Sequence, residues 1–158
     1  MSLSPPLRHA IAEAIGHHGG RRPAMLESLR MIQHEHGWVS DAHLAEAASI
    51  LDVTTAEMDD IATFYSLIFR EPVGRKLILL CDGASCYLNG GEDVRDRVMD
   101  RLGIGFDETT PDGEYTLINI CCVGACDKAP AALVGRDRSV VGPLSPTDLD
   151  ALLGKGVE

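Results

Sequence analysis

The sequence predicts an α+β protein in which a helical bundle is followed by an α/β unit. Apolar residues recur with helical spacing from about residue 5 to residue 70. Pro72 and Gly74 then interrupt this pattern, and the next apolar run, Lys76 to Leu80, is short and continuous, as in a buried strand. The elements after it are ordered strand, helix, strand, hairpin, helix. We therefore expect two domains, residues 1–72 and 73–158.

The helical domain carries clear helix-boundary signals. His17 and His18 precede two glycines and are expected to close a first helix, and a second is predicted from Pro23 to His36, ending at Gly37. A third helix begins near Ser40, and a fourth begins with a capping box formed by Thr54 and Glu57. The apolar faces of these last two helices are Leu44, Ala47, Ala48 and Leu51, and Met58, Ile61, Tyr65 and Ile68.

The second domain is predicted to have two strands that each lead into a cysteine loop. The first strand is Lys76 to Leu80, and a helix from about Gly91 to Leu102 follows its loop. The second strand is Glu114 to Ile120. Residues 131–134 and 139–141 suggest a hairpin, and a terminal helix is expected with Ser145 as its cap and Pro146 and Asp148 in its first turn.

The composition excludes several classes of function. The net charge of -10 repels phosphate backbones and anionic lipid head groups, so no nucleic acid partner is expected. The longest unbroken apolar run, Leu77 to Cys81, is far shorter than the roughly 20 residues that cross a bilayer, so we expect no direct membrane insertion. The first twenty residues lack the pattern of a signal peptide. These features indicate a cytoplasmic protein.

The cysteines are the strongest chemical signal. Four of the five are spaced as C-x4-C (Cys81, Cys86) and C-x3-C (Cys122, Cys126), and each pair follows a predicted strand. If the strands are neighbours in one sheet, both loops leave at the same edge and four thiolates converge. This pattern favours an iron-sulfur cluster over structural zinc, although spacing alone does not exclude zinc. A thiol-disulfide oxidoreductase is less favoured, because no C-x-x-C precedes a helix.

Two long segments resemble a known family. These segments, ATFYSLIFREPVGRKLILLCDGASC (62–86) and TTPDGEYTLINICCVGACDKAP (109–130), are similar to the small [2Fe-2S] subunit, of the E type, of bacterial respiratory complex I, NADH:quinone oxidoreductase. IQHEHGWVSDAHL (32–44) resembles the helical part of the same small subunit, so the resemblance covers about residues 24–153. It implies a thioredoxin-like [2Fe-2S] ferredoxin domain in which Cys81, Cys86, Cys122 and Cys126 bind one cluster.

The resemblance also implies partners. The family's small subunit carries single electrons, while FMN and NADH bind to a flavin-bearing partner of the F type, with further iron-sulfur subunits nearby. Such a chain would be cytoplasmic and peripheral to the inner membrane through the complex. Homologous subunits serve NAD-dependent formate dehydrogenases and NAD-linked hydrogenases, and these remain alternatives. The chain has no G-x-G-x-x-G turn, so we expect no NADH oxidation by the isolated chain.

Several residues near these motifs carry weaker expectations. Cys121 is expected to be a small residue at a strand end and not a ligand. Lys128 is expected to be a solvated loop lysine, and Asn89 to end the first cysteine loop, with Ser85 or Asn89 as alternative donors to a sulfur. Phe64, Tyr65 and Phe69 are expected to pack in the core. Residues 1–72 are predicted to be chiefly a docking segment, because they contain no cysteine.

Overall fold

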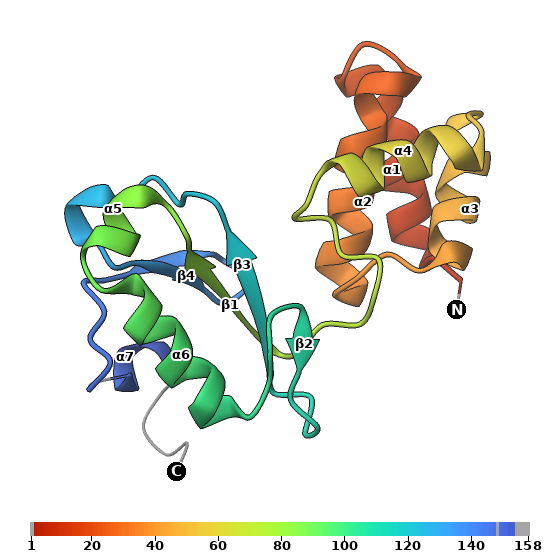
Figure 1. Ribbon diagram of the computed structural model, residues 1–158. Coiled ribbons are helices and arrows are strands. Elements are labelled where there is room, and N and C mark those ends of the chain that lie inside the picture. Colours follow the sequence, from red (N-terminus) through yellow and green to blue (C-terminus); the bar gives the residue numbers. More distant parts are fainter. Residues whose placement is uncertain (1, 148, 154–158) are drawn as a thin grey trace. The chain divides into compact units, whose positions relative to one another are not determined.

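The computed structural model describes residues 2–147 and 149–153. The chain divides into two compact units, Met1–Pro72 and Val73–Glu158. The first unit is entirely helical, whereas the second contains a sheet with helices (Figure 1). Each unit has its own cluster of buried apolar side chains. The α+β class predicted from the sequence is therefore confirmed.

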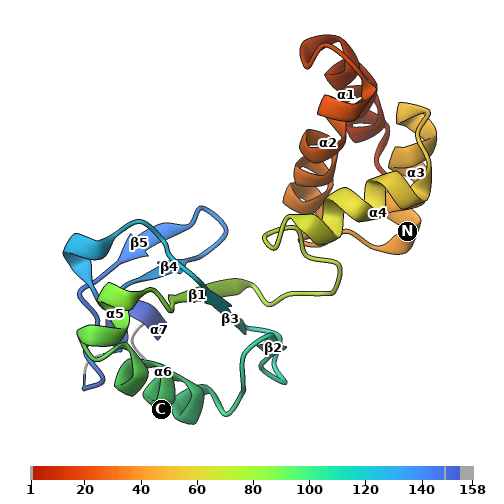
Figure 2. The same ribbon diagram turned by 45° about the horizontal axis from the view of Figure 1, so that its top comes forward.

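Four helices make up the first unit: α1 (Pro5–His17), α2 (Arg21–His36), α3 (Asp41–Leu51) and α4 (Thr55–Phe64). They group around one apolar core (Figure 2). The largest side chains that are fully buried in this core come from all four helices and the loop before α3: Ile11, Leu29, Ile32, Val39, Leu51 and Met58. Burial of these side chains supplies the main stabilisation of the unit.

The predicted helix boundaries are largely confirmed. Gly37 ends α2 in the left-handed conformation with φ 87°, and its N–H donates to the Gln33 carbonyl at 2.7 Å. The Ser40 hydroxyl caps α3 by accepting from the His43 N–H at 3.2 Å. The helix α2 begins at Arg21, slightly earlier than expected from the position of Pro23. Local capping chemistry thus determines most of these ends.

The predicted length of α4 is wrong. The helix ends at Phe64, and Tyr65 and Ile68 lie in the following loop. The side-chain amide of Gln33 holds this loop, since its Nε2 donates to the Leu67 carbonyl at 2.9 Å and its Oε1 accepts from the Phe69 N–H at 2.6 Å. These contacts come from residues distant in sequence, and they replace the bonds of a further helical turn.

Arg70 fastens the end of the same loop. Its guanidinium pairs with Asp59 at 3.1 Å and with Asp41 at 2.5 Å, and also donates to the Val39 carbonyl. Arg70 therefore ties the end of the loop to α3, α4 and the segment before α3. Phe64, the last residue of α4, is 78% exposed and Tyr65 is 42% exposed, so the expected core packing of these two side chains is wrong.

A five-stranded sheet forms the centre of the second unit. Its strands are β1 (Lys76–Cys81), β2 (Glu108–Thr109), β3 (Tyr115–Ile120), β4 (Ala132–Val134) and β5 (Ser139–Val141), in the order β2-β3-β1-β4-β5. The pair β1 and β3 is parallel, and the other neighbours are antiparallel. The predicted hairpin of β4 and β5 is confirmed. The two-residue strand β2 was not expected from the sequence.

Helices of the second unit are α5 (Ala84–Leu88), α6 (Gly91–Leu102) and α7 (Asp150–Leu153), with a 3-10 turn, η1, at Cys126–Lys128. The predicted bounds of α6 are confirmed. Side chains of α6 and of the segment containing α7 pack against β1 and β3 in one core, which includes Ile78, Leu80, Val94, Val98, Leu117, Leu149 and Leu152. Figure 1 shows α6 and α7 together beside the sheet.

The predicted start of the terminal helix is wrong. Residues 146 and 147 form a turn and α7 begins at Asp150, while the expected first-turn residue Asp148 lies outside the described residues. The Ser145 hydroxyl accepts from the Thr147 N–H at 3.3 Å. Ser145 therefore closes a tight turn, a local alternative to helix capping that serine readily adopts.

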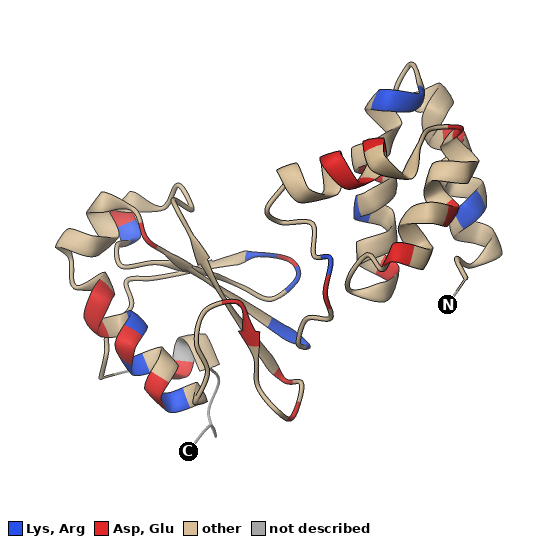
Figure 3. Cartoon of the chain, turned by 45° about the vertical axis from the view of Figure 1, so that its right-hand side comes forward, with Lys and Arg blue, Asp and Glu red and all other residues tan. Residues whose placement is uncertain are grey.

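Charged side chains are distributed over helices of both units, and α6 carries acidic and basic residues along its length (Figure 3). Among the described residues, no helix has the length and apolar character needed to cross a membrane.

The capping box of α4 gives a direct test of the helical unit. Thr54 Oγ1 accepts from the Glu57 N–H at 3.2 Å, and the Glu57 carboxylate accepts from the Thr54 N–H at 3.0 Å. Thr54→Ala removes one of these bonds and should lower the free energy of unfolding by about 1 kcal/mol. Urea denaturation followed by circular dichroism measures this. The neighbouring Thr55→Ala is the control, and an equal loss in both variants would contradict the assigned role.

Candidate metal centre

The parallel pair β1 and β3 determines where the cysteine loops begin. Cys81 is the last residue of β1, and its register partner is Ile120, the last residue of β3. The Asp82 N–H donates to the Ile120 carbonyl at 2.8 Å, which extends the pairing by one residue. Both loops therefore leave the same edge of the sheet, as the sequence predicts for neighbouring parallel strands.

Each of the four predicted ligand residues lies on a different kind of local structure. Cys81 ends a strand, and Cys86 lies in the short helix α5 and is 2% exposed. Cys122 lies in the loop after β3, and Cys126 begins the turn η1. Both of these side chains are exposed, and all the cysteines are free thiols. One wall of the candidate site is thus buried while the other faces outward.

Cys81 contacts sulfur and amide groups from both loops. Burial by itself raises the pKa of the Cys81 thiol. Hydrogen bonds from the Gly83 and Val123 amides, and with the thiols of Cys86 and Cys122, favour the thiolate and bring the pKa below its ordinary value. The thiolate is the form that binds iron or zinc. Cys81 is therefore the point where the two loops meet.

The pKa of the Cys86 thiol is raised, whereas that of Cys81 is lowered. Burial raises the pKa of its thiol, and the hydrogen bond with Cys81 raises it further, although the Ala131 amide acts in the other direction. Negative charge at Cys81 and Cys126 also disfavours the Cys86 thiolate. Such repulsion is expected wherever thiolates lie close together with no cation between them. A bound metal group offsets this repulsion, because its cations attract each thiolate.

Backbone amides supply donors around the sulfurs. The Gly124 N–H donates to Cys122 Sγ at 3.4 Å, and Gly124 has a φ of 78°, which favours glycine. At Gly83, a Cβ atom would lie 3.0 Å from the Cys121 carbonyl oxygen and 3.4 Å from Cys81 Sγ. The small residues of both loops therefore allow main chain to approach the sulfurs closely.

Cys121 contributes its backbone to this arrangement. Its carbonyl oxygen lies 4.0 Å from Cys81 Sγ, within the range of a sulfur hydrogen bond, while its own side chain is exposed. The thiols that interact with Cys81 are those of Cys86 and Cys122. That Cys121 is not a ligand therefore stays a prediction.

The donor set fits an iron-sulfur cluster. In the part of the chain that the structure describes, no three His, Cys, Asp or Glu side chains are grouped closely enough to hold a metal ion, so the fit rests on the chemistry of the donors. A [2Fe-2S] cluster uses four cysteine thiolates, and amide hydrogen bonds to the sulfurs adjust its reduction potential. Two pairs of thiols, with amides aimed at Cys81, Cys86 and Cys122, satisfy both requirements.

Some expected neighbours of the site have other roles. The Asn89 side-chain amide donates to the Ser85 carbonyl at 2.7 Å, and Asn89 caps α5, so its amide is directed to main chain and not to sulfur. Lys128 is exposed, as expected of a solvated loop lysine.

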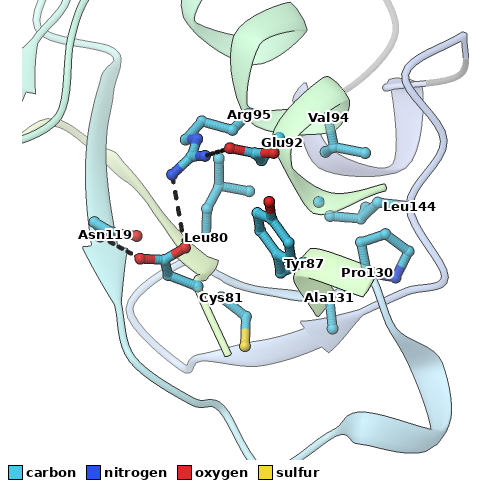
Figure 4. Close-up of a pocket in the computed structure, with 12 residues that line it drawn as sticks. Leu80, Cys81, Tyr87, Glu92, Val94, Arg95, Asn119, Pro130, Ala131 and Leu144 are labelled. Carbon is cyan, nitrogen blue, oxygen red and sulfur yellow. Dashed lines mark hydrogen bonds and ion pairs between the residues drawn. The ribbon is translucent and has the colours of Figure 1, made fainter. Parts of the chain in front are cut away.

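Sequence reasoning did not anticipate a polar network behind Cys81. The Asp82 carboxylate pairs with Arg95, which extends from α6, and it accepts a hydrogen bond from the Asn119 side chain (Figure 4). Arg95 and Asp82 line a small pocket together with Cys81. Asp82 directly follows a cysteine and Asn119 closely precedes one, so the sequence could have indicated these two residues. It could not have indicated Arg95, which lies on a separate helix.

Comparisons with known proteins agree with this chemistry. The family model described as thioredoxin-like [2Fe-2S] ferredoxin matches residues 11–156. The E-type subunit of NADH-quinone oxidoreductase from Pseudomonas aeruginosa is 39% identical over 151 residues, which are 96% of this chain and 90% of that protein. The corresponding E-type protein of Escherichia coli K12 is 38% identical over the same shares of the two chains.

A solved structure supports the fold. The crystal structure of an NAD+-reducing [NiFe]-hydrogenase in the H2-reduced state matches 84% of this chain with a TM-score of 0.72 and 24% identity. The chain spans 22% of the hydrogenase chain that it matches.

The close contact between α5 and α6 gives a test of how Cys86 is positioned. A Cβ atom at Gly91 would lie 2.7 Å from the Cys86 carbonyl oxygen, so Gly91→Ala must displace α5. We expect it to lower the free energy of unfolding by about 1–3 kcal/mol, as overpacking does. Gly16 in α1 has nothing within 4 Å of its Cβ position, so Gly16→Ala should instead stabilise by about 0.4–1 kcal/mol.

Urea denaturation of the two glycine variants measures these opposite effects. Stabilisation by both alanines would show that α5 yields to Gly91→Ala without cost.

Proposed function

The chain belongs to the thioredoxin-like [2Fe-2S] ferredoxin family, and we propose that it is the one-electron carrier subunit of an NADH:quinone oxidoreductase. In this proposal Cys81, Cys86, Cys122 and Cys126 hold one [2Fe-2S] cluster. The chain is an electron-transfer subunit of an enzyme complex and has no NADH oxidation activity by itself.

The observation that carries the proposal is the meeting of both cysteine loops at one sheet edge. Cys81 and Ile120 are register partners, and the Cys81 thiol interacts with thiols from its own loop and from the other. The strands β1 and β3, whose side chains belong to the core of the unit, hold the start of both loops. The site is therefore built on rigid elements.

Each part of the chain has a defined task in this function. The four thiolates bind the irons, and a bound cluster supplies exchange of one electron at a time. The amides of Gly83, Val123, Ala131 and Gly124 direct positive dipole ends at the sulfurs, which stabilises added negative charge. Burial of Cys86 shields one side of the site from water, while Cys122 and Cys126 lie toward the outside.

A partner must supply the electrons. NADH gives up two electrons as hydride, and flavins carry out this kind of transfer in enzymes. We therefore propose a flavin- and NADH-binding partner of the F type, which holds the FMN, and further iron-sulfur subunits beyond it. The complex would place this chain on the cytoplasmic side, peripheral to the inner membrane.

The related enzymes remain a second candidate. Homologous small subunits belong to NAD-dependent formate dehydrogenases and NAD-linked hydrogenases, and the hydrogenase structure shares the fold. Quinone oxidoreductase is favoured because relatives with that name are 38–39% identical and match 96% of the chain. The proteins encoded beside this one in the genome distinguish the candidates.

Metal analysis of the purified chain tests the proposed function. Red-brown protein with two irons and two acid-labile sulfides per chain supports it. Colourless protein with zinc would indicate an interaction module instead, and metal-free protein with a reactive dithiol would indicate a thiol-disulfide oxidoreductase.

Serine substitutions test the ligands one by one. Loss of one thiolate leaves an iron incompletely ligated, so serine at Cys81, Cys86, Cys122 or Cys126 should abolish or destabilise the cluster. Cys121→Ser is the matched control and should retain it, because the thiols that interact with Cys81 are those of Cys86 and Cys122. Visible absorbance and iron content of the five variants decide between them. Cluster loss in Cys121→Ser, with retention in Cys122→Ser, would reverse the assignment of the third ligand.

We also propose that residues 1–72 are chiefly a docking segment. All five cysteines lie in the second unit, which has its own core, so the helical unit is not needed to form the site. The helical unit exposes two aromatic side chains in edge contact, Phe64 at 78% and Tyr65 at 42%. Exposed aromatic residues are enriched in protein interfaces, which supports this role.

The docking proposal predicts separable behaviour of the two units. A fragment of residues 73–158 should still bind the cluster with a near-native spectrum but should not co-purify with the flavin-bearing partner. In the full chain, Phe64→Asp should weaken that association at least tenfold. Val140→Asp, which changes a 45% exposed apolar side chain of the other unit, is the control. Cluster loss in the fragment, or normal association of the fragment and of Phe64→Asp, would refute the division of roles.

A further inference from the structure

The polar network behind Cys81 contains a cation that is held in a fixed position. Arg95 Nη1 lies 3.6 Å from Asp82 Oδ1, and Arg95 Nη2 lies 3.2 Å from Glu92 Oε1. Figure 4 shows the guanidinium between these two carboxylates. The Arg95 side chain is 26% exposed, so solvent screens its charge less than that of a loop lysine such as Lys128.

Asp82 links Arg95 to the start of both cysteine loops. It directly follows Cys81, and its N–H donates to the Ile120 carbonyl at the end of β3. Its second carboxylate oxygen accepts from Asn119 Nδ2 at 3.3 Å. The Asp82 carboxylate is thus held on one side by α6 and on the other by β3. These contacts hold the negative charge of Asp82 and the positive charge of Arg95 in defined positions beside Cys81.

Charge at this position affects reduction of the site. With two ferric irons, two sulfides and four thiolates, the oxidised site carries -2, and one added electron makes it -3. The chain already carries a net charge of -10, so further negative charge disfavours reduction. Of the described residues that line the pocket beside Cys81, Arg95 is the basic one, whereas Asp82 and Glu92 are acidic.

We propose that Arg95 and Asp82 form a charge pair that sets the reduction potential of the cluster. Arg95 raises the potential by offsetting the added electron, and Asp82 lowers it while keeping Arg95 in place. The inference rests on the proposed function, since it concerns the cluster that Cys81, Cys86, Cys122 and Cys126 are proposed to hold. Neither residue is a ligand, and both act through charge and position.

The two residues of the pair should shift the potential in opposite directions. Arg95→Gln removes a positive charge and should make reduction harder, whereas Asp82→Asn removes a negative charge and should make it easier. We expect several-fold changes in the equilibrium constant for accepting one electron, where a tenfold change corresponds to about 59 mV. The double variant should return toward the wild-type value. General loosening of the loop would move both single variants in the same direction.

The experiment is a redox titration of the purified full chain, in which dithionite gives one electron to each cluster and visible absorbance reports its reduction. Arg95→Lys keeps the charge and should retain most of the wild-type potential, although it loses the forked contact of the guanidinium. Arg97→Gln is the matched control, because it changes the same net charge from an exposed position on the same helix.

The outcomes separate the inference from the proposed function. Absence of iron and sulfide in the wild-type chain refutes the proposed function itself. A wild-type cluster with shifts of the same sign in Arg95→Gln and Asp82→Asn, or with shifts no larger than in Arg97→Gln, refutes the charge pair alone. If Arg95→Gln does not fold, the potential of Asp82→Asn decides, and a value equal to or below that of the wild type overturns the proposal.

Discussion

The parallel pairing of β1 and β3 is the constraint on which the candidate site depends. Parallel neighbours carry their chains in one direction, so the loops after Cys81 and Ile120 start side by side. Leu80, Ile78 and Leu117 anchor these two strands in the core under α6. The side chains of the site are few and partly exposed, whereas the strands beneath them are buried. The precision of the site therefore comes from the sheet and not from the loops.

The two units have separate cores, which is the arrangement that the two proposed roles require. The helical unit buries its own apolar faces and uses Gln33 and Arg70 to fasten the loop after α4, and it leaves Phe64 outside. All five cysteines lie in the second unit, which has its own core. An electron carrier in a larger complex needs both a stable cluster site and an attachment surface. Placing them in different units allows each to change without disturbing the other.

Sequence patterns predicted the elements that are determined locally. The capping box at Thr54, the glycine end of α2 and the bounds of α6 all follow from residues close together in the chain. Some errors arise where distant residues decide, and others arise where the local signal is weak or fits two structures. Gln33 stops α4 from continuing through Tyr65, and α5 is too short to show a helical period. The four cysteines were recognisable from spacing, but the contact between Arg95 and Asp82 depends on how α6 packs on the sheet.

The electrostatics of the site follow from the same architecture. An acidic chain that holds a cluster through four thiolates, as proposed, must offset repulsion before it can accept an electron. Amides at tight glycine turns provide part of this offset at Cys81 and Cys122, because turn geometry directs N–H groups inward. Amides supply only partial charges, whereas a full positive charge has to come from a basic side chain. Arg95 is long enough to reach from α6 to the end of β1. Because α6 packs against β1 in the core, the helix that stabilises the sheet also brings Arg95 to the Asp82 carboxylate beside Cys81.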